Sequence, residues 1–242
     1  DVPRPPGEGG VDYADASVTR STTLANFLIK IPMKDYGNIT NITDNDLTST
    51  GTNNLRDDAN SSDSYSQYNY ASISSIGIAI DGVTIYPVLN NTLTPAQEAA
   101  EITNTGIHVG QGLQLHYHAD GHSATGNGLN LYNISDYTSQ DHPPLIGFGY
   151  DGIALFGKYE SSFSSMDGYS TTLDSYGGHT HGDYGYHYHA HTANSVTEGL
   201  STTSYNLHIL LKGAWYGSIN NIPDFLNTPS RQPIVTLSPN QS

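Results

Sequence analysis

A pattern of three histidines occurs twice in this chain, at a fixed distance along the sequence. "HVGQGLQLHYHA" (108–119) aligns without a gap with "HTHGDYGYHYHA" (179–190), so His-x7-His-x-His recurs 71 residues later. A second pair of segments, "IAIDGVTIYP" (78–87) and "FGYDGIALFG" (148–157), repeats at an offset of 70. Two different patterns that keep almost one offset predict an internal duplication. The alternative is coincidence among degenerate strand patterns.

The shorter pair of segments predicts the fold class. Each places Asp-Gly between alternating apolar residues, which is a strong signal for a β-hairpin with a type I′ turn. The chain contains 18 tyrosines and only 13% charged residues, and it is rich in Ser, Thr, Asn and Gly, as strands and turns are. We therefore predict an all-β fold, a β-sandwich or jelly roll with pseudo-twofold duplication and half-repeats of about 75–145 and 146–217.

The segments outside the repeats predict a core domain with strand-forming terminal arms. Residues 1–31 begin as a Pro/Gly-rich extended arm and continue into an apolar strand, and residues 231–242 form a second strand-like tail. The domain between them spans 32–230. Within it, "TPAQEAAEI" (94–102) has a threonine cap, a proline in the first turn and good helix formers, so we expect one short helix.

The histidines are spaced to converge on one face of a strand. Alternate residues of a strand face the same side, so His116 projects with His118, and His187 with His189. The seven residues before each pair are enough to return a third imidazole toward it. The candidate ligands are His108, His116, His118, His179, His187 and His189, with His181, His191, Asp120 and His142 as weaker candidates.

Three imidazoles with open coordination positions suit a divalent transition metal, zinc or copper. The alternative is a ladder of neutral, hydrogen-bonded histidines without metal. Because only neutral imidazole binds a metal, an ion held this way should be lost below a pH of about 6. The intervening Tyr117, Tyr186 and Tyr188 are expected to face the opposite side and pack in the core, with their hydroxyls paired.

Charge and composition exclude several classes of partner and chemistry. The formal net charge of −15 repels phosphate backbones and anionic lipid, so we expect no nucleic-acid or membrane-surface partner, and no apolar run is long enough to span a membrane. The lack of cysteine excludes disulfides and thiolate ligands. Glycans are permitted by six Asn-x-Ser/Thr sequons, at Asn38, Asn41, Asn60, Asn90, Asn133 and Asn240.

Several of these motifs together resemble those of the YHYH-domain family. They are "SIGIAIDGVTIYP", "HPPLIGFGYDGIALFG", "GGHTH" and "GYHYHAHT", which occur in the family's order within roughly 75–217. The resemblance implies a secreted β domain and brings no established reaction with it. Family members often carry cysteines near the Gly-His-Thr-His segment and after the YHYH strand. This chain has "LDSYGGHTH" (173–181) and "LLKGAWYGS" (210–218) there instead, and its first half reads "LHYH" rather than "YHYH".

Two functions from different classes are compatible with these features. The first is an extracellular or cell-surface structural protein, a filament or surface-layer subunit that polymerises head to tail by strand addition of a terminal arm, with metal bound for stability. The second is a secreted metal-binding protein or metalloenzyme. No Gly-x-Ser-x-Gly motif and no assignable carboxylate pair is present, so we name no catalytic residue and favour the structural hypothesis.

Overall fold

A computed structural model of the chain describes thirteen stretches of its 242 residues. All the regular elements within them are β-strands, as predicted, and within them no helix is long and apolar enough to cross a membrane. Residues 94–101 of the expected helix lie outside the described part. The described stretches are 27–29, 31, 75–88, 102, 105–109, 115–121, 131–133, 139–161, 165–174, 176–196, 205–212, 215–217 and 234–236.

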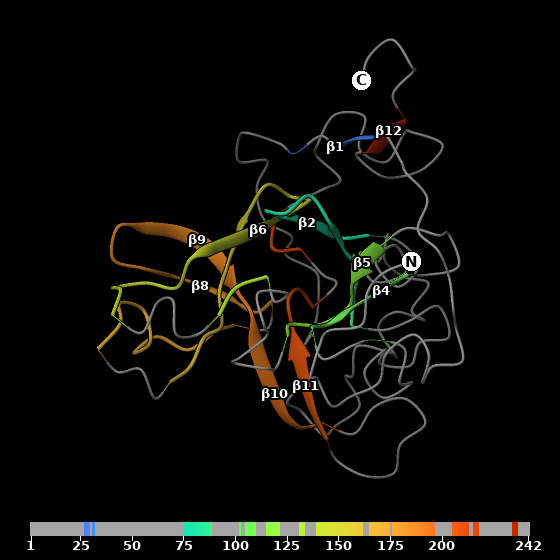
Figure 1. The fold of residues 1–242 in the computed structure, drawn as a ribbon. Coiled ribbons are helices and arrows are strands. Elements are labelled where there is room, and N and C mark those ends of the chain that lie inside the picture. The colour runs from blue at the N-terminus through green and yellow to red at the C-terminus, as the bar shows by residue number, and fades with distance from the viewer. Residues whose placement is uncertain are drawn as a thin grey trace, which may run out of the picture.

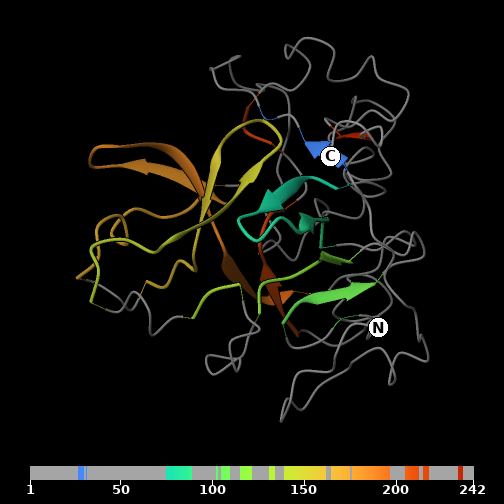
Figure 2. The ribbon, with the colours of Figure 1, turned by 45° about the horizontal axis from the view of Figure 1, so that its top comes forward.

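Eight of the strands form one curled sheet in the order β4-β5-β3-β2-β6-β7-β9-β8 (Figures 1 and 2). A sandwich or jelly roll needs a second sheet packed against this one, and the described strands do not form one, so that part of the fold stays a prediction. The strands are β2 (Gly77–Ala79), β3 (Thr84–Ile85), β4 (Ile107–Val109), β5 (Leu115–Tyr117), β6 (Leu145–Gly149), β7 (Ala154–Phe156), β8 (Gly178–His181) and β9 (Tyr184–His189).

The order of this sheet is the same when it is followed from either end. In each half, an antiparallel hairpin (β2-β3 or β6-β7) pairs in parallel with a strand (β5 or β9), which pairs antiparallel with an outer strand (β4 or β8). The halves join through the antiparallel pair β2-β6. The segments with the 70- and 71-residue offsets therefore occupy equivalent places in the sheet.

The two Asp-Gly hairpins form where they were expected, but their turns are not type I′. The Gly82 amide donates to the Ala79 carbonyl and the Ala79 amide to the Val83 carbonyl, which makes a three-residue loop that ends in a left-handed glycine (Gly82 φ +84°). Such a loop is a type I turn followed by a bulge. The second hairpin makes the same two bonds around Gly152 (φ +87°), so the type I′ prediction is wrong for both.

The core lies on the side of the sheet that the predicted tyrosines face. Tyr117 and Tyr188 are buried, and their hydroxyls donate to the carboxylates of Asp81 and Asp151. Tyr186 is half-buried and donates to Asp174. The buried residues of this core are Ile76, Ala79, Ile85, Tyr117, Ile146, Tyr150, Leu155, Tyr188, Ala190, Leu210, Leu211 and Trp215.

Four short strands lie outside the curled sheet. The hairpin of β10 (His191–Val196) and β11 (Tyr205–Ile209) leads into core residues Leu210 and Leu211. The strands of the terminal arms, β1 (Phe27–Ile29) and β12 (Ile234–Thr236), pair with each other in antiparallel register.

Candidate metal centres

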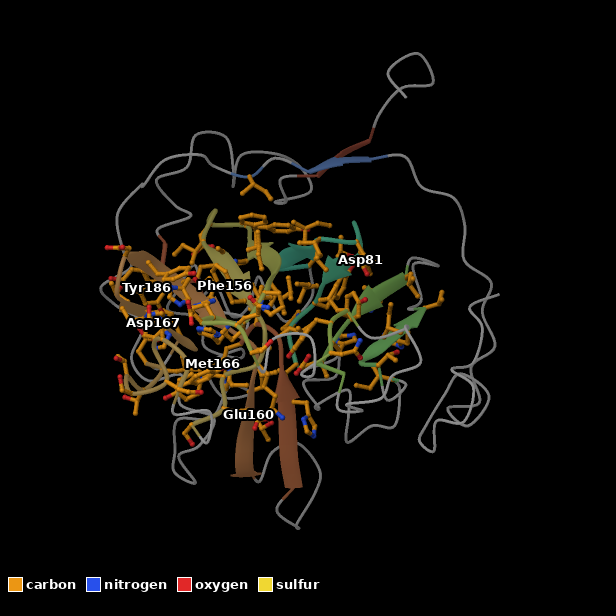
Figure 3. The ribbon with its side chains drawn as sticks, turned by 60° about the vertical axis from the view of Figure 1, so that its left-hand side comes forward. Asp81, Phe156, Glu160, Met166, Asp167 and Tyr186 are labelled. Atoms are coloured by element: carbon orange, nitrogen blue, oxygen red, sulfur yellow. The ribbon has the colours of Figure 1, made fainter. Side chains whose placement is uncertain are left out.

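Two clusters of histidines lie at opposite ends of the curled sheet. The first histidine site comprises His108, His116 and His118, from β4 and from β5 and its end. The second comprises His142, His181, His187 and His189, from the segment before β6 and from β8 and β9. Figure 3 shows Phe156 and Asp167, which flank the second site, toward one side of the molecule, and Asp81 of the other half toward the opposite side.

Strand pairing brings the first site together. The register of β4 with β5 sets His108 directly opposite His116, and His118 follows at the end of β5 on the same face. The Nε2 atom of His116 lies 2.9 Å from that of His108 and 3.2 Å from that of His118. The predicted His-x7-His-x-His geometry is therefore present, with the seven intervening residues joining two paired strands.

The second site is assembled from more distant parts of the chain. His187 and His189 alternate along β9, and their Nε2 atoms are 3.2 Å apart. The Nε2 atom of His142 reaches to 3.3 Å from that of His187. His181 completes the group, in which one nitrogen of each residue lies within 4.8 Å of the others.

Backbone carbonyls fix which nitrogen of these rings carries the proton. The Nδ1 atom of His118 donates to the Pro87 carbonyl (2.7 Å) and that of His189 to the Gly157 carbonyl (2.8 Å), two acceptors in equivalent places after β3 and β7. A carbonyl oxygen only accepts, so Nδ1 is protonated and Nε2 presents a lone pair. The same bond is made by His142 to Pro143 and by His187 to Gly185.

Burial keeps the rings neutral. Loss of solvent lowers the pKa of His142 and of His187 to about 4 and that of His189 to about 2, and it holds the pKa of His118 well below its usual value. Neighbouring histidines lower these values further. These four imidazoles are therefore uncharged at neutral pH, which is the form that binds metal.

In the second site, three lone pairs face one another. The Nε2 atoms of His142, His187 and His189 are unprotonated and 3.2–3.3 Å apart along the chain of contacts, so these contacts are repulsive and not hydrogen bonds. A tetrahedral ion with metal–nitrogen bonds of about 2.0–2.1 Å sets its ligand atoms about 3.3 Å apart. Two ligands at right angles on such an ion would be about 2.9 Å apart, so spacings of 2.9–3.2 Å in the first site and 3.2–3.3 Å in the second are within the range for a transition-metal ion. The Nδ1 protons fixed by carbonyls supply the outer hydrogen bonds that such ligands usually make.

The three remaining predicted ligands, His179, His191 and Asp120, belong to neither cluster. His179 pairs with His187 across β8 and β9 and lies beside the second site. His191 donates from Nδ1 to the His189 carbonyl, outside both groups. Asp120 is buried, accepts a hydrogen bond from the Tyr132 hydroxyl and also lies outside them; burial raises its pKa to about 7.

Of the six sequon asparagines, only Asn133 lies in the described part of the chain, where it is half-buried.

Aromatic and acidic neighbours that the sequence patterns did not single out enclose the sites. The Tyr86 ring stacks on His116 with centroids 4.1 Å apart, and Phe156 packs edge-on against His142 at 4.4 Å. Tyr86 and Phe156 are 70 residues apart within the hairpin repeat, so the offset could have identified them. Asp167, whose carboxylate lies 3.2 Å from His181 Nδ1, has no such signal in the sequence.

The described part of the chain is therefore built of β-strands and holds two buried clusters of histidines. Searches against protein-family models, curated proteins and solved structures find no match to this chain. The functional argument therefore rests on the geometry of the two sites.

Proposed function

We propose that this protein binds one divalent transition-metal ion, zinc or copper, at each histidine site and that the ions stabilise the fold. The observation that carries the proposal is the set of unprotonated Nε2 atoms facing one another at 3.2–3.3 Å in the second site. Without a cation, buried lone pairs face one another and no bond offsets their repulsion. A bound ion makes each of them a coordinate bond.

Each ion would link segments that are otherwise held by few backbone bonds. In the first site it joins the outer strand β4 to β5, and in the second it joins β8 and β9 to the segment that carries His142. The ligands of the second site are spread over residues 142–189, so the unfolded chain does not present that site. Those of the first lie within residues 108–118 and are aligned by the pairing of β4 with β5. Binding therefore adds directly to the free energy of unfolding.

Metal analysis of protein purified without an affinity tag tests this proposal. We expect two equivalents of ion in the wild type, and one in each of two double variants, His116→Ala with His118→Ala and His187→Ala with His189→Ala. A His208→Gln variant is the control, because His208 lies on β11 outside both sites. Less than half an equivalent in the wild type, after exposure to zinc or copper at neutral pH, contradicts the proposal.

We also propose that the two halves arose by duplication and, from the order of the motifs, that the chain is a YHYH-domain protein. The equal pairing order supports the duplication, and so do equivalent single bonds. The tyrosine–aspartate pairs Tyr117–Asp81 and Tyr188–Asp151 match, as do the bonds from the amides of His118 and His189 to the carbonyls of left-handed glycines, Gly106 and Gly177.

A second candidate function is extracellular assembly through the terminal arms, in which the β1–β12 pair that forms within one chain would be exchanged between copies. The alternative is that both arms stay on their own chain. Strands β1 and β12 pair with each other and with no strand of the curled sheet. Three residues from each end are complementary in register, so the same pairing between two copies would join subunits head to tail. Deletion of residues 1–31 should then abolish filaments seen by electron microscopy. A wild-type protein that stays monomeric at high concentration contradicts this candidate.

A further inference from the structure

The second histidine site has a fifth imidazole beside it, that of His179. Its Nδ1 atom donates to the Thr171 carbonyl at 2.9 Å, so its Nε2 atom carries a lone pair. That Nε2 atom is buried and has no hydrogen-bond partner among the described residues. A buried polar atom without a partner is unfavourable, and a bond from this nitrogen to a bound ion would remove that cost.

His179 occupies the place on β8 that His108 of the first site occupies on β4. His179 lies opposite His187 on β8 and β9 as His108 lies opposite His116 on β4 and β5, and His108 is within 2.9 Å of its partner, Nε2 to Nε2. The ring of His179 has its centroid 5.0 Å from those of His187 and His189, the separation that these two rings have from each other.

His181 faces the same place. Both of its ring nitrogens are buried without a hydrogen-bond partner among the described residues, and its ring centroid is 4.7 Å from that of His179 and 4.9 Å from that of His187. Its Nδ1 atom lies 3.2 Å from the Asp167 carboxylate but outside hydrogen-bond geometry. A carboxylate at this distance is suited to orient a ligating histidine from the outside.

We propose that the second site binds one ion through five imidazoles, with His179 joining His142, His181, His187 and His189. The Nε2 atom of His179 stands outside the group of nitrogens that lie within 4.8 Å of one another, so binding of the ion would draw this ring inward. This inference rests on the proposed metal binding and adds a coordination number and an ion class. Zinc in structural sites takes four ligands in a tetrahedron, whereas copper(II) and nickel(II) favour tetragonal surroundings of nitrogen and oxygen atoms. Five nitrogens with no carboxylate among them therefore favour copper(II) or nickel(II) over zinc.

Cobalt(II) is the probe that tests the coordination number, because tetrahedral cobalt(II) absorbs visible light intensely and five-coordinate cobalt(II) weakly. The second site is isolated in the His116→Ala, His118→Ala variant. We expect this variant to bind one equivalent of cobalt(II) with weak visible bands. Changing His179→Ala in the same background should raise the band intensity several-fold, because four imidazoles remain.

Controls separate loss of the fifth ligand from loss of the fold. His208→Gln in the same background should leave the spectrum unchanged. His179→Ala in the otherwise wild-type chain should keep the ion of the first site, which reports that the sheet is still formed. If His179→Ala abolishes the fold, His179→Gln replaces it, since its amide can keep the bond to the Thr171 carbonyl.

Two outcomes overturn the inference while leaving metal binding intact. They are an intense tetrahedral spectrum that His179→Ala or His179→Gln does not change, and two cobalt ions in the isolated second site. Failure of the wild type to take up cobalt(II), zinc or copper at either site is a different result. It contradicts the proposed function itself and the five-imidazole centre with it.

Discussion

Tyr117 and Tyr188 occupy equivalent places but donate to aspartates in different surroundings. Asp151 is buried, and burial raises its pKa to about 6, whereas Asp81 is exposed at the hairpin turn. The Tyr188→Phe change removes a 2.6 Å bond from a buried carboxylate, so we expect a loss of about 1–3 kcal/mol in the free energy of unfolding. Tyr117→Phe should cost less, because water can replace its bond. Urea unfolding of both metal-free variants measures the difference, and equal losses would contradict this account.

The histidines also predict how the metal-free protein responds to acid. An unfolded histidine titrates near a pKa of about 6.5, whereas burial lowers the pKa of His187 to about 4 and that of His189 to about 2 in the folded chain. Between these values the unfolded chain binds more protons. Stability is therefore complete above about pH 6.5 and falls as the pH drops toward 4, and further toward 2.

Urea midpoints of the metal-free protein between pH 7.5 and 4.5 check this direction. A midpoint that stays constant or rises on acidification would be inconsistent with buried neutral histidines. The double variant His187→Ala with His189→Ala should show a shallower dependence on pH, because it lacks two of the groups that take up protons on unfolding.

At the level of elements, alanine substitutions at three left-handed glycines distinguish backbone strain alone from strain that also displaces a metal ligand. Gly82, Gly106 and Gly168 have φ values of +84°, +80° and +86°. A methyl group at Gly82 meets nothing within 4 Å, so Gly82→Ala should cost only the backbone strain of about 1–2 kcal/mol and leave both ions bound. At Gly106 it would collide with the Ala119 carbonyl, next to His118, and at Gly168 with the ring of His181.

We therefore expect Gly106→Ala to lose the ion of the first site and Gly168→Ala that of the second. Each variant should keep one equivalent of metal by elemental analysis, and Gly82→Ala should keep two. Retention of two equivalents by both site variants would show that these loops do not position the ligands.

Sequence patterns identified the elements that rest on local signals and missed those that depend on tertiary contacts. The alternation of His116 with His118 and the Asp-Gly hairpins are local, so strand and face could be predicted. The turn type depends on which amide closes the loop, and the Asp-Gly pair does not decide it. His142 and Asp167 join the second site through contacts between distant segments, so His142 was only a weaker candidate and Asp167 was not one.

For the whole molecule, the separation of the two sites predicts that their contributions to stability add. They share no ligand and lie at opposite ends of the curled sheet. An ion at 100 times its dissociation constant adds about 2.7 kcal/mol to the free energy of unfolding, and independent sites add within about 0.5 kcal/mol. The metal-dependent rise in the unfolding midpoint of the wild type should therefore correspond to the sum of the rises in the two double variants. A clear excess over that sum would indicate coupling through the sheet.

The position of the sites at the ends of the sheet has a consequence for solubility. Strands β4 and β8 each pair on one side only within the curled sheet, and each carries a histidine that belongs to a cluster. Unpaired edge strands are templates on which further chains can add, and an edge that frays is a better template than one that is fixed. An ion that fixes each outer strand to its neighbour would therefore reduce the association of further chains at these edges. We expect chelation at neutral pH to increase light scattering over hours, and restored metal to prevent the increase.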